Sequence, residues 1–288
     1  MAADPPGRHD AAATPQDPRR GRPRPDRPSG RTSGRLDLGD AIHDGWLAFC
    51  RAPRAFTAFA LLANLLILLQ QPLLARIGNA ARPSTQLGDW VLYGLGLSLM
   101  AGLFLWGCIG LGRGAVLALQ GRRPPLRTLL LWDGAAWLRL LRAWLRLITM
   151  VALPSGTGAL LFGLPLLTLQ LEPALQARLG REATQLLGLS LAALLLLTLA
   201  LTLVGVLYLT VNQAFLLPIV LVEGLGGAAA VRRGRELVDP QWPLVLLLVL
   251  LLAILNGLGL LACAVGSLVA WPAVVCMSTA AYRQLSQV

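Results

Sequence analysis

The stretch LLGLSLAALLLLTLALTLVGVLYLTVNQAFLLPIVLV, residues 186–222, decides the fold class of this chain. Its 37 residues include no charged side chain. As one straight helix they would extend about 55 Å, whereas the hydrocarbon layer of a membrane is about 30 Å thick. The helix must therefore break. Asn212, Gln213 and Pro218 mark the predicted break, with a span ending near Val211 and the remainder turning along the interface.

The composition of the whole chain favours the same class. Of its 288 residues, 56% are apolar and only 14% are charged, and the mean hydropathy is +0.64. A soluble domain carries about 25% charged residues. We therefore predict an all-α fold, a polytopic membrane helical bundle over residues 36–288, rather than two soluble domains.

Two further apolar runs, residues 56–75 and 90–111, have the length of single membrane crossings. The second run contains the small-residue pairs Ser98-x3-Gly102 and Gly110-x3-Gly114. Such pairs let helix backbones approach closely in a membrane. These pairs offer close contact between the second span and neighbouring helices.

The remaining runs are irregular. Residues 147–171 contain Pro154, Gly156, Gly158 and Pro165, which predict a kinked or locally unwound helix. Residues 244–282 number 39, too many for one crossing, and Gly257, Gly259 and Gly266 are predicted to supply a turn between two spans. The sequence therefore predicts about six transmembrane helices.

The arginines divide unevenly between the two sides of the membrane. If the N-terminus is cytoplasmic, 4 arginines fall on the outer side (Arg76, Arg82, Arg178 and Arg181). The cytoplasmic segments then carry 13 outside the tail: Arg51, Arg54, Arg113, Arg122, Arg123, Arg127, Arg139, Arg142, Arg146, Arg232, Arg233, Arg235 and Arg283. Positive charge accumulates on the cytoplasmic side. We therefore predict a multi-pass protein of the inner (cytoplasmic) membrane with both termini inside.

Residues 1–35 form a Pro- and Arg-rich tail with eight Arg, four Asp and no apolar run. Such a segment buries too little apolar surface to fold, so we expect it to be disordered. Its positive charge is compatible with nucleic acid or with anionic lipid heads. We favour lipid and expect no nucleic-acid partner.

Short amphipathic segments precede the odd-numbered spans and are predicted to lie at the membrane interface. The first has the apolar face Leu38, Ile42, Gly45, Trp46 and Phe49. The second, from about residue 130 to 146, sets Trp137, Leu141, Trp144 and Ile148 against Arg139, Arg142 and Arg146. The third sets Gly227, Ala230, Val231, Gly234 and Val238 against Arg232, Arg233, Arg235 and Glu236. The six arginines of the last two segments are the candidate contacts with lipid heads.

These segments suggest an internal repeat. Ala41-x3-Gly45-x3-Phe49 matches Ala230-x3-Gly234-x3-Val238 in residue type, and a proline follows each. A three-fold repeat would divide the chain into residues 36–118, 119–222 and 223–288. Each unit would contain one interfacial helix and two spans.

Three stretches, LDLGDAIHDGWLAFCRAPRAF (36–56), PIVLVEGLGGAAAVRRGRELV (218–238) and AAYRQL (280–285), resemble a family of bacterial integral membrane proteins. These proteins are related to the membrane domain of glycerophosphoryl diester phosphodiesterases. The resemblance covers roughly residues 36–285 and implies a membrane architecture with a link to lipids. In that family the catalytic domain uses paired His with several Glu and Asp, and this chain has only two His.

The sequence offers little for catalysis or cofactors. His9 and His43 are the only histidines, and the four cysteines have no CxxC spacing. Metal sites need clustered His, Cys, Asp or Glu, and a phosphate-binding loop needs a Gly-rich GK[ST] motif. We therefore predict no catalytic, metal or cofactor site.

The candidate intramembrane polar contacts are the neutral amides Asn64, Asn212, Gln213 and Asn256, which are expected to bond between helices. Two functions remain open. One is a non-enzymatic membrane module, either lipid-associated or a scaffold for an unknown protein partner. The alternative is a permease or exporter of an amphipathic solute, using helices broken by Gly and Pro. A mid-membrane cavity lined by Asn64, Asn212 or Asn256 would favour transport.

Overall fold

The computed structural model of the chain describes residues 35–80, 87–171, 180–262 and 265–286. These residues form helices and no strand, and six helical stretches are long and apolar enough to cross a membrane. The prediction of an all-α, polytopic membrane fold is therefore confirmed. The predicted tail, but for Arg35, lies outside the described residues, as do Arg82 and Arg178.

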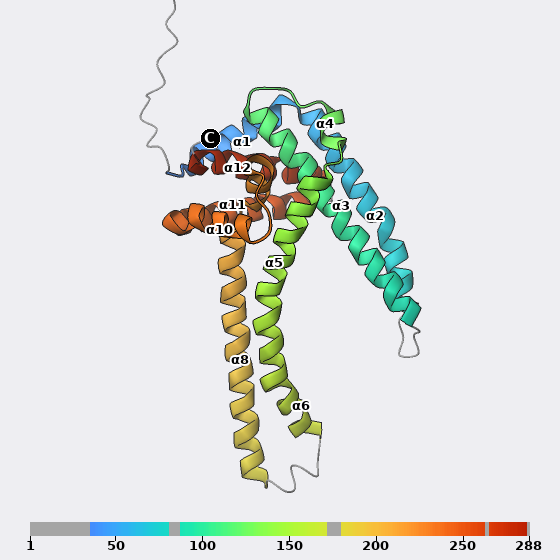
Figure 1. Cartoon of the computed structure of the whole chain (residues 1–288), viewed down its shortest axis with the longest axis vertical. Helices are drawn as coiled ribbons and strands as arrows, with labels where there is room; N and C mark the ends of the chain where they lie inside the picture. The colour runs from blue at the N-terminus through green and yellow to red at the C-terminus, as the bar shows by residue number, and fades with distance from the viewer. Residues whose placement is uncertain (1–34, 81–86, 172–179, 263–264, 287–288) are drawn as a thin grey trace, which may run out of the picture. The chain divides into compact units, whose positions relative to one another are not determined.

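The first two helices begin at residues that are suited to the start of a helix. Asp37 caps α1, because its Oδ1 accepts the backbone N–H of Asp40 at 3.1 Å. Pro53, which is suited to the first position of a helix, begins α2 immediately after α1 ends. This part of the chain contains α1 (Leu38–Arg51), α2 (Pro53–Ala80), α3 (Leu87–Leu119) and α4 (Leu126–Leu130) (Figure 1).

The second half begins at Asp133, whose Oδ1 accepts the N–H of Ala136 at 2.9 Å and caps α5. The predicted break in residues 186–222 is confirmed, because α8 ends at Asn212. Gly224, with a left-handed φ of 69°, ends the π-helical turn η2. The elements are α5 (Gly134–Gly158), η1 (Ala159–Gly163), α6 (Leu164–Leu171), α8 (Arg181–Asn212), α9 (Leu216–Pro218), η2 (Ile219–Glu223), α10 (Gly227–Val238), η3 (Asp239–Gln241), α11 (Trp242–Leu261) and α12 (Val265–Ser286).

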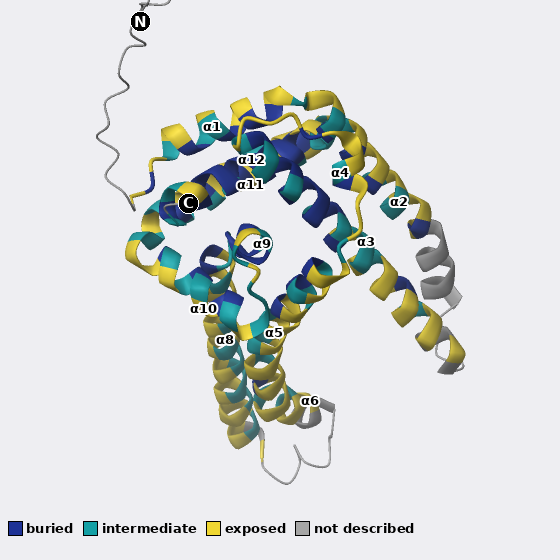
Figure 2. Cartoon of the chain, turned by 45° about the horizontal axis from the view of Figure 1, so that its top comes forward, coloured by how far each residue is buried: buried dark blue, intermediate teal, exposed yellow. Residues whose placement is uncertain are grey.

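Helix α12 lies at the centre of the core. It contacts α1, α2, α3 and α11, and more than half of its apolar stretch is buried (Figure 2). Gly45 of α1 rests directly on its backbone, since a Cβ at that position would overlap the Cα of Met277. Gly110 of α3 similarly leaves room for the ring of Phe59 on α2. Small residues therefore bring these helices into close contact, as predicted for the Gly110 pair.

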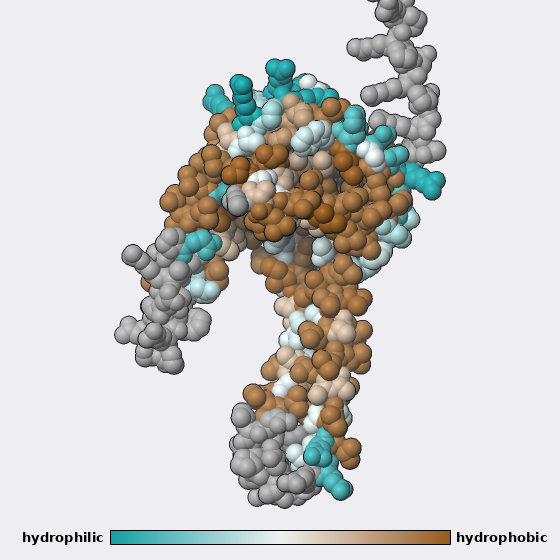
Figure 3. All heavy atoms as spheres, turned by 180° about the vertical axis from the view of Figure 1, so that it is seen from behind, coloured by the Kyte–Doolittle hydropathy of each residue, from teal (hydrophilic) through white to brown (hydrophobic). Residues whose placement is uncertain are grey.

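Helices α5 and α8 lie side by side and form the least buried part of the described chain (Figure 1). None of the apolar stretch of α8 is buried, and Leu186, Leu189 and Leu203 are each 69–70% exposed. Figure 3 shows apolar side chains over most of this pair, whereas hydrophilic side chains gather at the top of the view. The two helices touch closely where Gly158 meets Thr198.

The predicted turn at Gly257, Gly259 and Gly266 was wrong in detail. The first two lie inside α11, which continues to Leu261, and Gly266 lies in α12. A Cβ on Gly259 would lie 2.5 Å from the Cβ of Ala270, and one on Gly266 would overlap the carbonyl oxygen of Gly259. Gly259 and Gly266 therefore allow two helices to approach each other rather than forming the turn.

The prediction that the chain turns along the interface after residue 212 was also wrong. Phe215, Leu216, Ile219 and Val220 of this segment are all buried in the protein core. The Phe215 ring packs 6.5 Å from that of Tyr282 on α12. A segment that is apolar on all sides is better buried on protein than laid along a half-wet interface.

The second amphipathic segment is not a separate helix, because α5 runs without interruption from Gly134 to Gly158. No Gly or Pro occurs between Ala135 and Leu153, so nothing stops the helix before Pro154. The predicted interfacial segment is instead the first half of α5.

Candidate functional site

The candidate site lies where α10 packs on α5. A Cβ on Gly226, just before α10, would lie 2.9 Å from the Cβ of Arg139 on α5. Farther along both helices, the Arg235 Nη2 lies 3.9 Å from the Sδ of Met150. Packing of α10 on α5 therefore places Arg139 and Arg235 at the contact between the two helices. One other predicted lipid-contact arginine of α10 is directed elsewhere.

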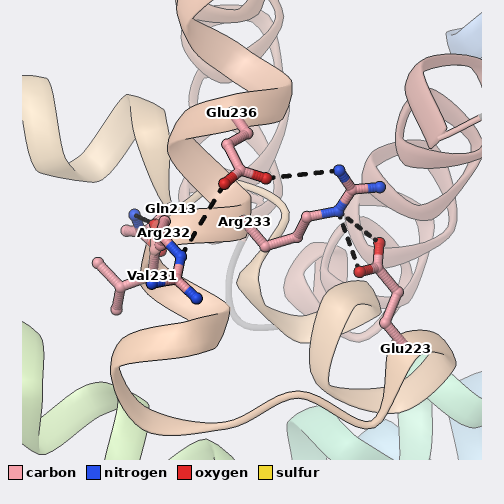
Figure 4. Close-up of polar contacts among 6 residues, drawn as sticks. All are labelled: Gln213, Glu223, Val231, Arg232, Arg233 and Glu236. Atoms are coloured by element: carbon pink, nitrogen blue, oxygen red, sulfur yellow. Dashed lines mark hydrogen bonds and ion pairs between the residues drawn. The ribbon is translucent and has the colours of Figure 1, made fainter.

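That arginine is Arg233, which faces the core side of α10. Its Nε donates to both oxygens of Glu223, at 3.0 and 3.2 Å, and its Nη1 lies 3.6 Å from Glu236 (Figure 4). The Arg232 Nε lies 4.0 Å from the same Glu236 in an exposed pair. Arg235, in contrast, has only the Met150 sulfur as a described neighbour for hydrogen bonding.

The three arginines of α5 carry no compensating charge. Arg142 and Arg146 are exposed, and Arg139 is half-buried. Among the residues that the structure describes, none of the three side chains forms a hydrogen bond or an ion pair. The Nε atoms of Arg139 and of Arg235 are both buried and have no hydrogen-bond partner within the described part of the chain. We call Arg139, Arg142, Arg146 and Arg235 the open arginine cluster.

Apolar side chains accompany this cluster on α5. Trp144 and Ile148 are 43% and 53% exposed, so this part of the predicted apolar face is not covered by the described protein. The stripe that packs on protein consists instead of Ala136, Leu140 and Ala143. Trp137, from the predicted face, is half-buried, and its Nε1 donates to the Gly102 carbonyl of α3 at 3.4 Å.

Two of the four candidate amides bond between elements. Asn212 is fully buried, and its Nδ2 donates to Oδ1 of Asp239 at 3.1 Å. The Gln213 Nε2 donates to the Val231 carbonyl of α10 at 3.1 Å (Figure 4). Gly234 makes this contact possible, since it lies against the Asn212 carbonyl oxygen.

The other two amides do not join helices. Asn64 is half-buried, and its Nδ2 donates to the Ala60 carbonyl of its own helix at 2.8 Å. Asn256 is exposed on α11, contrary to the expectation that it bonds between helices. Ile254 and Leu258, two residues to either side in the sequence, are also exposed, at 58% each.

Sequence reasoning missed a polar anchor at the end of α12. The hydroxyl of the buried Tyr282 donates to Oε1 of Glu223 at 2.7 Å, so Glu223 joins Tyr282 and Arg233. One signal was available, because Glu223 is the acid that directly follows the 37-residue uncharged stretch. This anchor holds η2, α10 and α12 together.

A second charged pair lies at the other end of the candidate site. Arg113 lies on α3, just beyond residue 111, where the span was predicted to end. Its side chain pairs with Asp133 and donates to the Leu131 carbonyl at 3.0 Å. The backbone N–H of Ala136 holds the pKa of Asp133 below its ordinary value, and Arg113 lowers it further. Arg113 is therefore unavailable to an anion, unlike the open arginine cluster.

A cavity of about 200 Å³ lies between α5 and α8, beside the cluster. It is lined by Met150, Val151, Pro154, Thr198, Leu201, Thr202, Gly205, Val206 and Leu209. Asn64, Asn212 and Asn256 do not line it, so it is not the polar cavity that would favour transport. Among the described residues, no group of three His, Cys, Asp or Glu is placed to hold a metal ion.

The site thus combines unpaired arginines, exposed aromatic and aliphatic side chains, and an apolar cavity on one helix pair. No known protein family, curated protein or solved structure matches this chain.

Proposed function

We propose that this chain is a non-enzymatic integral membrane module that binds anionic phospholipid heads through Arg139, Arg142 and Arg146. We further propose that it is related to the membrane domain of glycerophosphoryl diester phosphodiesterases and lies in the cytoplasmic membrane with both termini inside. The observation that carries the proposal is that no described acidic residue pairs with these three arginines, while Trp144 and Ile148 of the same helix are exposed.

Physical chemistry supports phosphate as the missing partner. A guanidinium offers parallel N–H donors that match two phosphate oxygens. Near an anionic membrane surface each arginine contributes about 1 kcal/mol of attraction. Trp and Ile side chains on the same helix favour the boundary between heads and acyl chains. The segment therefore carries both parts of a lipid-binding surface.

The alternative, a permease, has one supporting observation. Helix α5 contains Pro154 and continues through the π-helical turn η1 into α6, and π-helical turns of this kind are frequent at functional sites. The adjacent cavity is lined mainly by apolar side chains, however, and the buried Asn212 is bonded to Asp239. We therefore favour the lipid-binding module.

The test replaces Arg139, Arg142 and Arg146 together by Gln in the full-length protein. We expect the variant to retain much less phosphatidylglycerol per protein after purification in mild detergent, measured as lipid phosphorus. The matched control replaces the exposed Arg122, Arg123 and Arg127 by Gln, which removes equal charge. Equal losses in both variants, or no loss in the first, would reject the proposal.

The proposed orientation has its own test. In a variant without its natural cysteines, Arg232→Cys is expected to be protected from a membrane-impermeant thiol reagent in intact cells. Arg82→Cys is expected to react. Labelling at position 232 from outside would reverse the topology.

A further inference from the structure

The cavity between α5 and α8 is closed by a helix contact at one end and lies near the charge of Arg235 at the other. At one end, Gly158 and Thr198 are in such close contact that a Cβ on the glycine would overlap the threonine methyl group. At the other end lies Met150, whose Sδ is 3.9 Å from Arg235 Nη2. The cavity therefore extends along the helix pair from a floor at Thr198 toward Arg235.

The size and lining of the cavity suit an aliphatic chain. Its wall along α8 reaches from Thr198 to Leu209, which corresponds to about 16 Å of helix at 1.5 Å per residue. An enclosed apolar cavity of about 150 Å³ is enough to bind benzene; this cavity measures about 200 Å³ and is open on one side, so a longer chain can enter it from the side. The side chains from Leu201 to Leu209 offer mainly apolar surface.

Arg235 does not line the cavity itself, but it lies beside Met150, which does. No described carboxylate pairs with its charge. Arg233 and Arg232, in the preceding turn, both contact carboxylates. The Nε of Arg235 is buried without a partner, and among described residues only a thioether sulfur accepts from its guanidinium. Burying an N–H donor of a charged guanidinium costs free energy unless an anion accepts its hydrogen bond. Arg146, one helical turn before Met150, adds a second unpaired charge nearby.

We propose that this cavity is a binding site for one anionic glycerophospholipid, with an acyl chain between α5 and α8 and the phosphate on Arg235. The proposal deepens the lipid-binding function above and rests on it for the choice of ligand. It differs from a general attraction to the membrane surface in that a single lipid is held by a shaped site. An unpaired charge at one end and an apolar, half-open groove along the helix pair together favour an anionic lipid as the occupant.

Gly205 gives a direct test, because it lines the cavity and a Cβ there would meet nothing within 4 Å. Gly205→Phe is expected to fill the cavity without disturbing the backbone. The matched control is Gly257→Phe on α11, where a Cβ likewise meets nothing within 4 Å. Both proteins are purified in mild detergent with phosphatidylglycerol, and bound lipid is counted by native mass spectrometry.

We expect the unmodified protein and Gly257→Phe to retain one phosphatidylglycerol, and Gly205→Phe to lose at least tenfold in occupancy. The role of the Arg235 charge in binding the phosphate is tested by Arg235→Gln. The matched control is Arg232→Gln, which makes the same change about one helical turn away. Only the first is expected to lower occupancy, and phosphatidylcholine is expected to bind weakly to all variants. Retention of the lipid in both Gly205→Phe and Arg235→Gln would overturn the proposal.

Other occupants give different results. If inorganic phosphate raised the melting temperature as much as phosphatidylglycerol did, the site would bind a free anion, and the proposal would be rejected. If Gly205→Phe turned a dimer into a monomer without changing bound lipid, a second copy would be the occupant, and the proposal would also be rejected. The two proposals can fail separately. The triple arginine test measures the total lipid phosphorus that purifies with the protein, whereas Gly205→Phe tests only the occupancy of the cavity, in a protein whose α5 arginines are intact.

Discussion

Helices α8 and α12 are both long enough to cross a membrane, yet they are stabilised in different ways. Most of the apolar stretch of α12 is buried against other helices, whereas none of that of α8 is (Figure 2). The α12 sequence is rich in small residues, and α8 is rich in leucine. Small residues let protein surround a helix closely, while leucine is equally suited to lipid tails. Sequence composition thus distinguishes a span held by protein from one that faces lipid.

The comparison has a functional side. The helix held by protein ends in the Tyr282–Glu223–Arg233 anchor, where charges are paired. The exposed helix pair α5 and α8 lies beside the open arginine cluster, whose charges have no acidic partner among the described residues. We therefore expect substitutions around α12 to affect folding, and those around α5 and α8 to affect lipid binding.

The largest effect is expected from Glu223→Leu, which removes the carboxylate that joins Arg233 to Tyr282. The variant leaves the buried Tyr282 hydroxyl without its acceptor and leaves Arg233 with only the exposed Glu236, which together cost about 2 kcal/mol. The control is Glu236→Leu, whose more exposed pairs are worth below about 1 kcal/mol. The free energy of unfolding, measured by denaturation in detergent micelles, is expected to fall far more in the first variant. Equal losses would show that α12 does not depend on this anchor.

Replacing glycine by alanine is expected to have opposite effects in the two regions. Gly45→Ala forces a Cβ onto the Met277 backbone, and overpacking of this kind costs about 1–3 kcal/mol. Gly205→Ala on α8 meets no neighbour, so the better helix propensity of Ala is expected to stabilise by up to about 1 kcal/mol. Thermal unfolding of both variants tests this. A gain at position 45 would contradict the close contact of α1 with α12.

A smaller, pH-dependent effect is expected at Asp133, where α5 joins the core. The Ala136 N–H and Arg113 lower the pKa of this carboxyl in the folded protein. Its contribution is therefore fully present above the ordinary pKa of about 4 and is lost as the pH falls through the lower folded value. Asp133→Asn keeps a capping oxygen but loses the charge, and it is expected to be less stable by about 1 kcal/mol at pH 7. The difference from the unmodified protein should vanish in acid, and a constant difference would assign the effect to the cap alone.

The sequence predicted the spans well because membrane length and hydrophobicity act locally. The break at Asn212 follows from 37 uncharged residues and a layer of fixed thickness. Partners across the fold were not predictable in this way. Arg233 and Arg235 look alike in sequence, yet one meets Glu223 and the other meets Met150, because only the packing of α10 decides which side chain faces which helix. The three-fold repeat stays a prediction.

The same limit applies to the membrane amides and gives the smallest expected effect. Asn256 is exposed on α11 and Asn64 bonds within its own helix, so neither holds two helices together. Bonds between polar side chains in membranes average only about 0.6 kcal/mol. We expect Asn64→Leu to lower the free energy of unfolding by less than that average. Asn256→Leu is expected to leave the free energy of unfolding unchanged or to raise it slightly, because leucine is better solvated by lipid than an unpaired amide is. Unfolding in lipid nanodiscs measures both. A loss of more than about 1 kcal/mol in Asn256→Leu would mean that protein covers this face of α11. Helix α11 would then be held by protein, as α12 is, rather than exposed, as α8 is.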